Sequence, residues 1–241
     1  MLPCKRLLLK ISGESLASHP EAPSDKKVLH FQTLSRIAED TSRLLQHGIE
    51  VCIVVGGGNI VRGSELAQTT YLDQPTADTM GMLATIINAI ALQQAIESKG
   101  VCSRVMSSFD CQAATEPYIR RRALQHLKKG RIVIFAAGTG NPYFTTDSAA
   151  ALRTLEMNCD VLLKATKVDG VYSADPKKVK NAFFYETLSY DEAIKYNLKI
   201  MDSTAFTLLR DHSTPLIIFS VERTHEIMDF IAGRGHCTRI F

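Results

Sequence analysis

Short apolar runs, each ending in a polar or glycine-rich loop and followed by a helical pattern, recur along this chain of 241 residues. Continuous apolar runs of this kind are typical of strands that are buried on both faces of a parallel sheet. Strands that alternate with helices predict an α/β fold, a three-layer sandwich with a central, mostly parallel sheet flanked by helices. The runs that we interpret as buried strands are 6–11, 50–55, 101–106, 131–135 and 160–164.

Apolar residues at helical spacing predict the layers that cover this sheet. One helix is predicted at 31–47, where His47-Gly48 closes it. The segment 78–96 is apolar around most of its circumference, as in a helix that is central to a core or buried against another subunit. Further helices are predicted at 118–129, 147–157, 190–196, 202–212 and 224–231, with a strand at 216–219 and a short last strand.

Length and composition limit the organisation of the chain. With 45% hydrophobic residues it can bury a sizeable core. Its length predicts one large domain or two closely joined lobes. The net charge of +3 is too small for a dedicated nucleic-acid surface, so we expect no nucleic-acid partner.

Cysteine spacing and hydropathy predict a reduced cytoplasmic protein. None of the six cysteines forms a Cys-x-x-Cys pair, which argues against a metal–thiolate site, and Cys52 is interpreted as a small buried hydrophobe. Three leucines between Arg6 and Lys10 are too few for a signal-peptide core. Polar residues such as Asn88 interrupt the segment 80–96, so we expect no membrane span.

The glycine-rich loops are predicted to meet at one edge of the sheet. Each follows a predicted strand, and parallel α/β sheets bind ligands at the carboxyl ends of their strands. Glycine lets backbone N–H groups approach phosphate oxygens closely, and Lys10 and Arg62 add positive charge. A binding site for a phosphate-bearing small molecule is therefore predicted. The loops concerned are 12–13, 56–59, 138–141 and 166–175.

The loop between Phe135 and Asp147 carries the densest set of polar groups. It holds two glycines, an Asn-Pro and three threonines, and we place Thr146 or Asp147 as the N-cap of the helix that follows. The helix start then offers free N–H groups and a positive dipole end to an anion. An ordinary strand-to-helix connection is the alternative interpretation.

Common nucleotide-binding signatures do not account for these loops. Gly58-x-x-x-x-Gly63-Ser64 has the spacing of a P-loop but no lysine. Gly138-Thr-Gly140 lacks the third glycine of a dinucleotide fingerprint, because Tyr143 stands in its place. The motif set of protein kinases is absent as well.

The motifs do resemble one known family, the bacterial uridylate (UMP) kinases, which have the amino-acid kinase fold. The resemblance runs from about Lys5 to the C-terminus. The first and last of its five motifs are shared across the wider fold group, whereas the third and fourth are narrower and identify the acceptor. The motifs are Lys10-Ile-Ser-Gly-Glu14, Gly56-Gly-Gly-Asn-Ile-Val-Arg-Gly63, Asp78-Thr-Met-Gly-Met-Leu-Ala-Thr85, Ala137-Gly-Thr-Gly-Asn-Pro-Tyr-Phe-Thr-Thr-Asp147 and Lys164-Ala-Thr-Lys-Val-Asp-Gly-Val-Tyr-Ser-Ala-Asp-Pro176.

The resemblance implies a single domain, 1–241, made of two tightly joined lobes. The N-terminal lobe, about 1–150, would bind the acceptor, and the C-terminal lobe, about 151–241, would bind ATP. The resemblance assigns ATP to Lys10, Ile11, Ser12, Gly13, Gly58, Arg62, Thr166, Tyr172 and Asp175. It assigns UMP to Gly57, Asp78, Thr139, Gly140, Asn141, Pro142, Tyr143, Phe144, Thr145 and Thr146. The side chains agree with this division, since the Asp78 carboxylate suits ribose hydroxyls better than phosphate.

The implied reaction transfers the γ-phosphoryl group of ATP to UMP and gives UDP, a step of pyrimidine nucleotide biosynthesis. The acceptor phosphate has a second pKa of about 6, so it is already anionic and needs no general base. We assign Lys10 to bridging the donor phosphates and Lys164 to a second cationic role. Asp147 would orient the lysine or a magnesium water, with Mg²⁺ held by the ATP phosphates and by no direct protein ligand.

The resemblance also implies partners and regulation. Its members form homohexamers built as trimers of dimers, and the helix 79–96 is our candidate for the dimer contact. UTP is expected as a feedback inhibitor, because it could occupy the acceptor region. The loop 18–25 departs from the glycine-rich family pattern, since it has two prolines and no glycine, which leaves activation by GTP open.

The same motifs have alternative interpretations. A kinase of the same fold that acts on a carboxylate or carbamate is one alternative, and a non-catalytic nucleotide-binding member is another. Asp147 can be an N-cap as well as a catalytic group, and Arg62 can be a surface helix charge. We favour an N-cap role for Asp202 and a plain turn at Asp169-Gly170.

Overall fold

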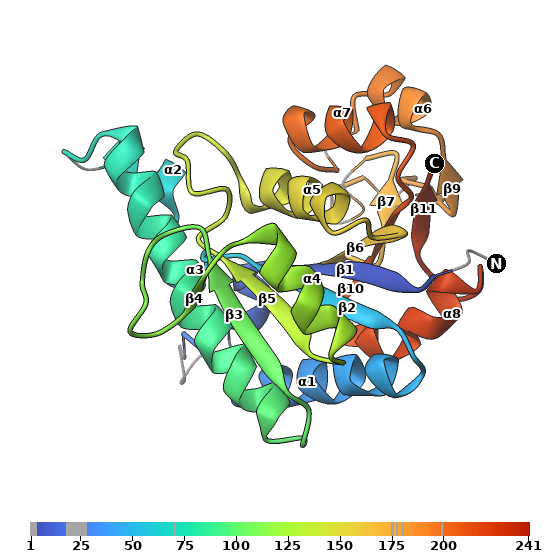
Figure 1. The fold of residues 1–241 in the computed structure, drawn as a ribbon. Coiled ribbons are helices and arrows are strands. Elements are labelled where there is room, and N and C mark those ends of the chain that lie inside the picture. The colour runs from blue at the N-terminus through green and yellow to red at the C-terminus, as the bar shows by residue number, and fades with distance from the viewer. Residues whose placement is uncertain are drawn as a thin grey trace.

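The computed structural model describes residues 4–17, 28–69, 71–174, 176, 178, 179, 181–198 and 200–241. Within them one sheet has nine strands in the order β4-β3-β5-β2-β1-β6-β10-β11-β9, and β7 (Val171–Tyr172) pairs with β8 (Phe184–Tyr185) in a separate hairpin sheet (Figure 1). The nine strands are β1 (Arg6–Ile11), β2 (Glu50–Val55), β3 (Ser103–Ser107), β4 (Glu116–Pro117), β5 (Ile132–Ala136), β6 (Val161–Thr166), β9 (Thr187–Leu188), β10 (Leu216–Ser220) and β11 (Thr238–Ile240).

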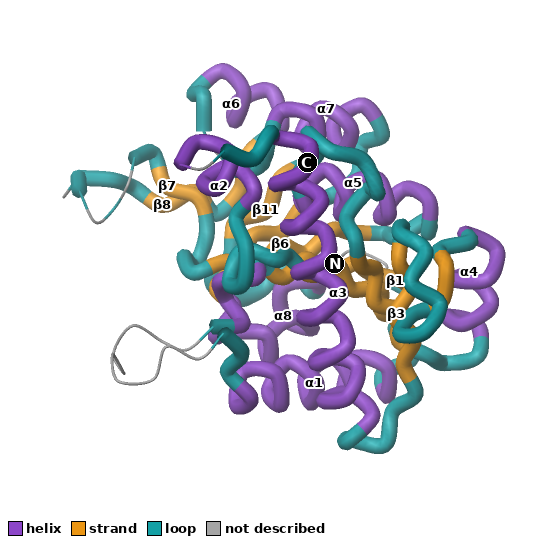
Figure 2. The backbone as a smooth tube through the Cα atoms, turned by 90° about the vertical axis from the view of Figure 1, so that its left-hand side faces the viewer, coloured by secondary structure: helices purple, strands orange, loops and turns teal. Residues whose placement is uncertain are grey.

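Helices cover both faces of the sheet, so the predicted three-layer α/β sandwich is confirmed (Figures 1 and 2). One face carries α1 (Phe31–Gln46), α3 (Gln74–Glu97) and α8 (Ile227–Ile231). The other face carries α4 (Arg120–Lys128), α5 (Thr146–Glu156), α6 (Tyr190–Lys195) and α7 (Ser203–Asp211). The short α2 (Gly63–Thr69) and the 3₁₀ turns η1 (Gly13–Leu16) and η2 (Val221–Glu226) complete the described helices.

The two-residue period of the central strand β1 decides which side chains reach which layer. Leu7, Leu9 and Ile11 belong to the core under α1, α3 and α8, whereas Leu8 belongs to the core under α4 to α7. Successive side chains of a strand point to opposite faces, so Lys10 shares the face of Leu8. The pattern thus places a lysine in the layer that contains α5.

The strand order places the carboxyl ends of β1 and its two neighbours at the same edge of the sheet. The chain leaves β1 for β2 on one side, and the C-terminal half begins with β6 on the other side. Both neighbours run parallel to β1, so all three carboxyl ends lie at one edge of the sheet. A reversal of strand order of this kind opens a crevice at the carboxyl ends.

Helix α3 begins earlier than the sequence pattern predicted. Asp73 is its N-cap and accepts the N–H of Thr76 at 2.9 Å, and Pro75 occupies the first turn. Its length and composition alone would suit a membrane span. In the fold, however, Leu92 and Ile96 pack in the core of the sheet, as in the core helix of a globular domain.

Most other element bounds agree with the predicted ones to within about two residues. The strands β4, β7, β8 and β9 were not predicted, because two residues are too few to show a period. The prediction that Cys52 is buried is confirmed. The division into two lobes near residue 150 stays a prediction.

Candidate active site

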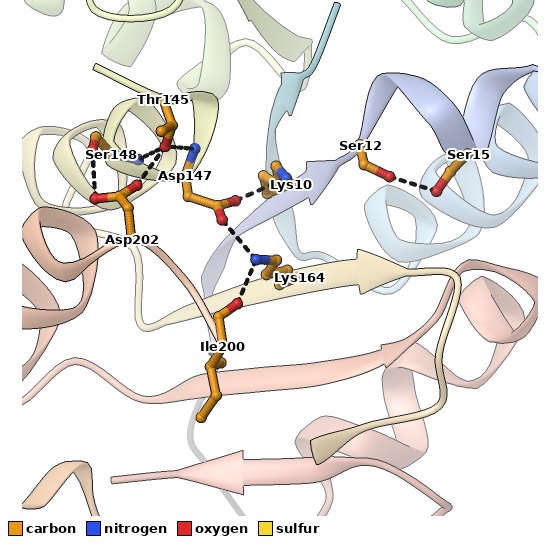
Figure 3. A network of polar contacts seen from close by, with 9 residues as sticks. All are labelled: Lys10, Ser12, Ser15, Thr145, Asp147, Ser148, Lys164, Ile200 and Asp202. Carbon is orange, nitrogen blue, oxygen red and sulfur yellow. Dashed lines mark hydrogen bonds and ion pairs between the residues drawn. The ribbon is translucent and has the colours of Figure 1, made fainter. Parts of the chain in front are cut away.

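Two lysines and one carboxylate form the centre of the site (Figure 3). Lys10 on β1 pairs in register with Lys164 on β6, so the two side chains stand side by side on one face. Asp147, in the first turn of α5, lies 2.8 Å from Lys10 Nζ through Oδ1 and 2.6 Å from Lys164 Nζ through Oδ2. One carboxylate therefore bridges two ammonium groups, and all three residues predicted as catalytic are in contact.

The protonation states follow from burial and from this pairing. Burial disfavours the charged form of Asp147, but the ammonium groups of Lys10 and Lys164 outweigh it and hold the pKa of the carboxyl below its usual value. Burial lowers the pKa of Lys164, and the positive charge of Lys10 adds to this effect, while Asp147 opposes it. Lys164 Nζ also donates to the carbonyl of Ile200 at 2.6 Å.

The N-cap of α5 is Thr145, so our placement of Thr146 or Asp147 as the cap is wrong. Thr145 Oγ1 accepts the N–H groups of Asp147 at 3.0 Å and Ser148 at 3.2 Å. Asp147 cannot cap because its carboxylate is turned toward the two lysines. The cap therefore lies one or two residues before the predicted position, and the Asp147 carboxylate is free to contact the lysines.

Asp202 joins α7 to the start of α5. It is the N-cap of α7, as predicted, and accepts the N–H of Ala205 at 2.9 Å. Its carboxylate also accepts the hydroxyls of Thr145 and, at 2.9 Å, of Ser148 (Figure 3). These last two contacts join the start of α5 to the C-terminal half of the chain, and no sequence pattern predicts them.

The glycine loops after β1 and β2 touch through their backbones. A Cβ added at Gly13 would lie 2.5 Å from the N atom of Gly58, and one added at Gly57 would lie 2.6 Å from the carbonyl oxygen of Gly81 on α3. Side chains larger than hydrogen do not fit at either position. Asn88 of α3 fixes the second loop by donating to the carbonyl of Gly56 at 2.7 Å.

A cavity of about 520 Å³ lies beside Arg62, and a larger one of about 820 Å³ opens over the two lysines. The larger cavity is of nucleotide size, and its apolar lining includes Val171 and Leu198. Tyr172 lies at its wall and donates its hydroxyl to Asp169 at 2.9 Å. The residues predicted to bind ATP that line it are Lys10, Ser12, Thr166 and Tyr172.

The loop 137–146, called here the acceptor loop, is held in an unusual backbone conformation. Ala137 has φ 59° and Tyr143 has φ 69°, both in the left-handed region that non-glycine residues rarely adopt. Thr85 Oγ1 accepts the N–H of Ala137 at 2.7 Å, and Asp78 Oδ2 accepts the N–H of Tyr143 at 2.8 Å. Two residues of α3 thus fix the loop, and one of them is a predicted UMP ligand.

Several predicted ligands lie outside this arrangement. Ile11 is fully buried in the core, and Arg62 forms ion pairs with Glu14 and Glu65. Arg62 precedes α2, so it is not a helix residue. The Asp169 carboxylate accepts hydrogen bonds from the Tyr172 hydroxyl and from Nε2 of His236. It therefore has tertiary contacts beyond the plain turn that we favoured. Asp175 and the loop 18–25 lie outside the described residues.

Comparison with known proteins identifies the relatives of the chain. The model of the amino acid kinase family matches residues 5–220. The uridylate kinase of Methylococcus capsulatus is 53% identical over 95% of this chain and 93% of its own length. That of Paramagnetospirillum magneticum is 50% identical over 98% of this chain and 96% of its own. The resemblance inferred from the motifs is confirmed.

Solved structures show the same likeness in three dimensions. The UMP kinase of Bacillus anthracis superimposes with a TM-score of 0.92 at 40% identity, covering 99% of this chain and 96% of the other. The UMP kinase of Ureaplasma parvum gives a TM-score of 0.91 at 36% identity, with 98% of each chain covered.

We expect Asp147→Asn to destabilise the protein by about 3–5 kcal/mol near neutral pH, because it leaves two buried ammonium groups unpaired. The folded-state pKa of Asp147 is depressed, so its stabilisation is present above the unfolded-state pKa of about 3.9 and is lost as the pH falls through the folded-state pKa. Urea unfolding of both proteins should therefore show a difference that shrinks on acidification. Asp211→Asn, at an exposed carboxylate, is the control, and an equal loss in both variants would contradict the prediction.

Proposed function

Because the chain belongs to the amino acid kinase family and, within it, to the uridylate kinases, we propose that the lysine–carboxylate centre transfers the γ-phosphoryl group of ATP to UMP. The observation that carries this proposal is that Lys10 and Lys164, bridged by Asp147, both line a cavity of nucleotide size. ATP occupies that cavity, and UMP lies against the acceptor loop. In this proposal the N-terminal lobe implied by the resemblance holds UMP and the C-terminal lobe holds ATP.

The two lysines and Asp147 suit a reaction in which negative charge must be neutralised and no proton has to be removed from the acceptor. The acceptor phosphate is anionic at neutral pH, so no group has to remove a proton from it. Lys10 and Lys164 face the region where negative charge spreads during transfer. Asp147 holds both ammonium groups in place, and its own depressed pKa keeps it ionised.

Magnesium enters with the nucleotide in this proposal. No group of three or more His, Cys, Asp or Glu that could hold a metal ion occurs among the described residues. Mg²⁺ is commonly held by substrate phosphates, waters and one or two carboxylates. Asp147, the carboxylate that contacts both lysines, is the residue proposed to orient a metal-bound water. When bound, the ion would neutralise phosphate charge.

An acceptor panel tests the activity. Purified protein is assayed for ADP release from ATP with UMP, CMP, AMP, glutamate or aspartate as acceptor. Release that depends on UMP supports the proposal. Transfer to the amino acids instead would favour a carboxylate kinase of the same fold, and no transfer with retained ATP binding would favour a non-catalytic member.

We expect Lys10→Ala to lower kcat by about a hundredfold or more, because it removes a buried cation aimed at the donor phosphates. UMP binding, measured by calorimetry, should persist. Lys5→Ala removes an exposed lysine just before β1 and is the matched control. Unchanged turnover in Lys10→Ala would show that the role assigned to this lysine is wrong.

We expect Asp78→Asn to weaken the binding of UMP far more than the binding of ATP. The carboxylate accepts the backbone N–H of Tyr143 and the side-chain amide of Gln74 at 2.7 Å, and it is proposed to accept ribose hydroxyls. Dissociation constants for both nucleotides, measured separately, provide the test. An equal loss for the two would undo the separation into donor and acceptor sites.

We propose a homohexamer, a trimer of dimers, whose dimer contact is the exposed apolar stripe of α3. The stripe consists of Met80, Leu83, Ile87 and Ile90, which are 37%, 48%, 51% and 39% exposed although α3 also packs in the core. A helix that is apolar on both sides buries its second side against a partner.

Ile87→Glu is expected to reduce the mass measured by light scattering, because it places a charge in this contact. Ile194→Glu, at a comparably exposed position on α6, should leave the mass unchanged. An unaltered mass in Ile87→Glu would exclude the stripe as the dimer contact.

Regulation and location complete the proposal. UTP carries the uracil and ribose of the acceptor together with a longer phosphate chain, so it is proposed as a feedback inhibitor that occupies the acceptor region. The enzyme is placed in the cytoplasm, where it would supply UDP for pyrimidine nucleotide biosynthesis.

A further inference from the structure

A buried arginine lies beneath the start of the acceptor loop, apart from the lysine–carboxylate centre. Arg153 on α5 is 4% exposed. Its Nη1 lies 2.5 Å from Glu156 Oε2, and its guanidinium carbon lies 3.8 Å from the ring centre of Tyr118. Its Nη2 donates to Ser108 Oγ at 2.9 Å. A carboxylate, an aromatic ring and a hydroxyl therefore fix the guanidinium together.

Ser108 links Arg153 to the backbone of the acceptor loop through two hydrogen bonds of its hydroxyl. Its hydroxyl accepts from Arg153 and donates to the carbonyl of Gly138 at 3.0 Å. Hydrogen bonds in such a chain polarise one another, so the bond to Gly138 is strengthened by the positive charge behind it. Ser108 also lies close under Gly140, where an added Cβ would be 3.0 Å from the serine Cβ.

The carbonyl that Ser108 holds belongs to the most constrained corner of the loop. Ala137 and Gly138 are consecutive left-handed residues, with φ 59° and 54°. Thr85 on α3 accepts the N–H of Ala137 at 2.7 Å, on the opposite side of the corner. A corner of this kind persists where its surroundings over-determine it. Here α3 fixes the N–H and the Ser108–Arg153 pair fixes the carbonyl.

We propose that Arg153 is a positioning residue for the phosphoryl acceptor, acting through Ser108 on the corner 137–138. The corner sets the direction in which the N–H and hydroxyl groups of residues 139–146 are presented to UMP. Burying the Arg153 guanidinium has a desolvation cost, and its ion pair with the partly exposed Glu156 offsets that cost only in part. A role in fixing the loop explains why this guanidinium is buried. The inference rests on the proposed assignment of the acceptor loop to UMP.

The main test is Ser108→Ala, which cuts the link to Gly138 but leaves the contacts of Arg153 with Glu156 and Tyr118 in place. Ser42→Ala is the matched control, because Ser42 is a buried serine that donates to a backbone carbonyl at 2.6 Å within α1. Ser108→Ala should raise KM for UMP about tenfold and leave KM for ATP unchanged. Both variants should lose similar thermal stability, and Ser42→Ala should keep both KM values.

A double-mutant cycle tests whether Arg153 acts through Ser108. A lysine at position 153 keeps the charge but cannot reach Glu156, Ser108 and the Tyr118 ring together. Arg153→Lys should raise KM for UMP at least as much as Ser108→Ala, and the double variant should add little to either. Additive effects, or an equal rise in KM for ATP, would overturn the proposal. If Arg153→Lys does not fold, the comparison of Ser108→Ala with Ser42→Ala still decides the question.

Asp78→Asn separates this inference from the proposed function beneath it. If Asp78→Asn weakens the binding of UMP and Ser108→Ala does not, the acceptor loop still binds UMP. Arg153 is then not the residue that positions this loop. If neither variant weakens UMP, the assignment of the loop fails, and the inference fails with it.

Discussion

The structure depends on one carboxylate that holds two like charges together. Lys10 and Lys164 occupy paired positions on neighbouring parallel strands, on the face covered by α5. Two ammonium groups one strand spacing apart repel each other by an amount on the order of 3 kcal/mol at an effective dielectric constant of about 20. Asp147 contacts both, so the repulsion becomes a three-membered ion cluster. A fold that keeps two cations side by side in this way is prepared for a polyanion.

The rest of the architecture serves to place that cluster. The order of the central strands opens a crevice beside β1, and the two-residue period turns the lysines toward it. Gly13 and Gly57 bring the loops so close to other backbone atoms that no side chain would fit at either position. The positive end of the α5 dipole faces the same region, and it favours the ionised form of Asp147 and the binding of phosphate.

The sequence predicted the fold well because buried parallel strands leave a plain signal. The apolar runs at β1, β2, β5 and β6 were found, and so was the convergence of the loops that follow them. Two-residue strands have no period to detect. The cap of α5 was misplaced because Thr145, Thr146 and Asp147 are all good cap residues, and tertiary contact with two lysines decided among them. The contacts of Arg153 with Ser108 and of Asp202 with Thr145 join residues far apart in the chain, which one sequence cannot reveal. The assignments of single residues to ATP or UMP stay predictions.

The acceptor loop shows how the two halves of the molecule are made to act together. Its first corner is held by Thr85 of α3, its middle by Asp78 of the same helix, and its end by Asp202 of α7. The left-handed conformation of Ala137 costs about 1–2 kcal/mol. The loop keeps this conformation because contacts from α3 and α7 hold it in place. The same α7 cap therefore connects the acceptor loop to the segment whose Ile200 carbonyl holds Lys164. A displacement of the C-terminal half would move the loop and the lysine together, so the geometry of the two sites is set by one shared set of contacts.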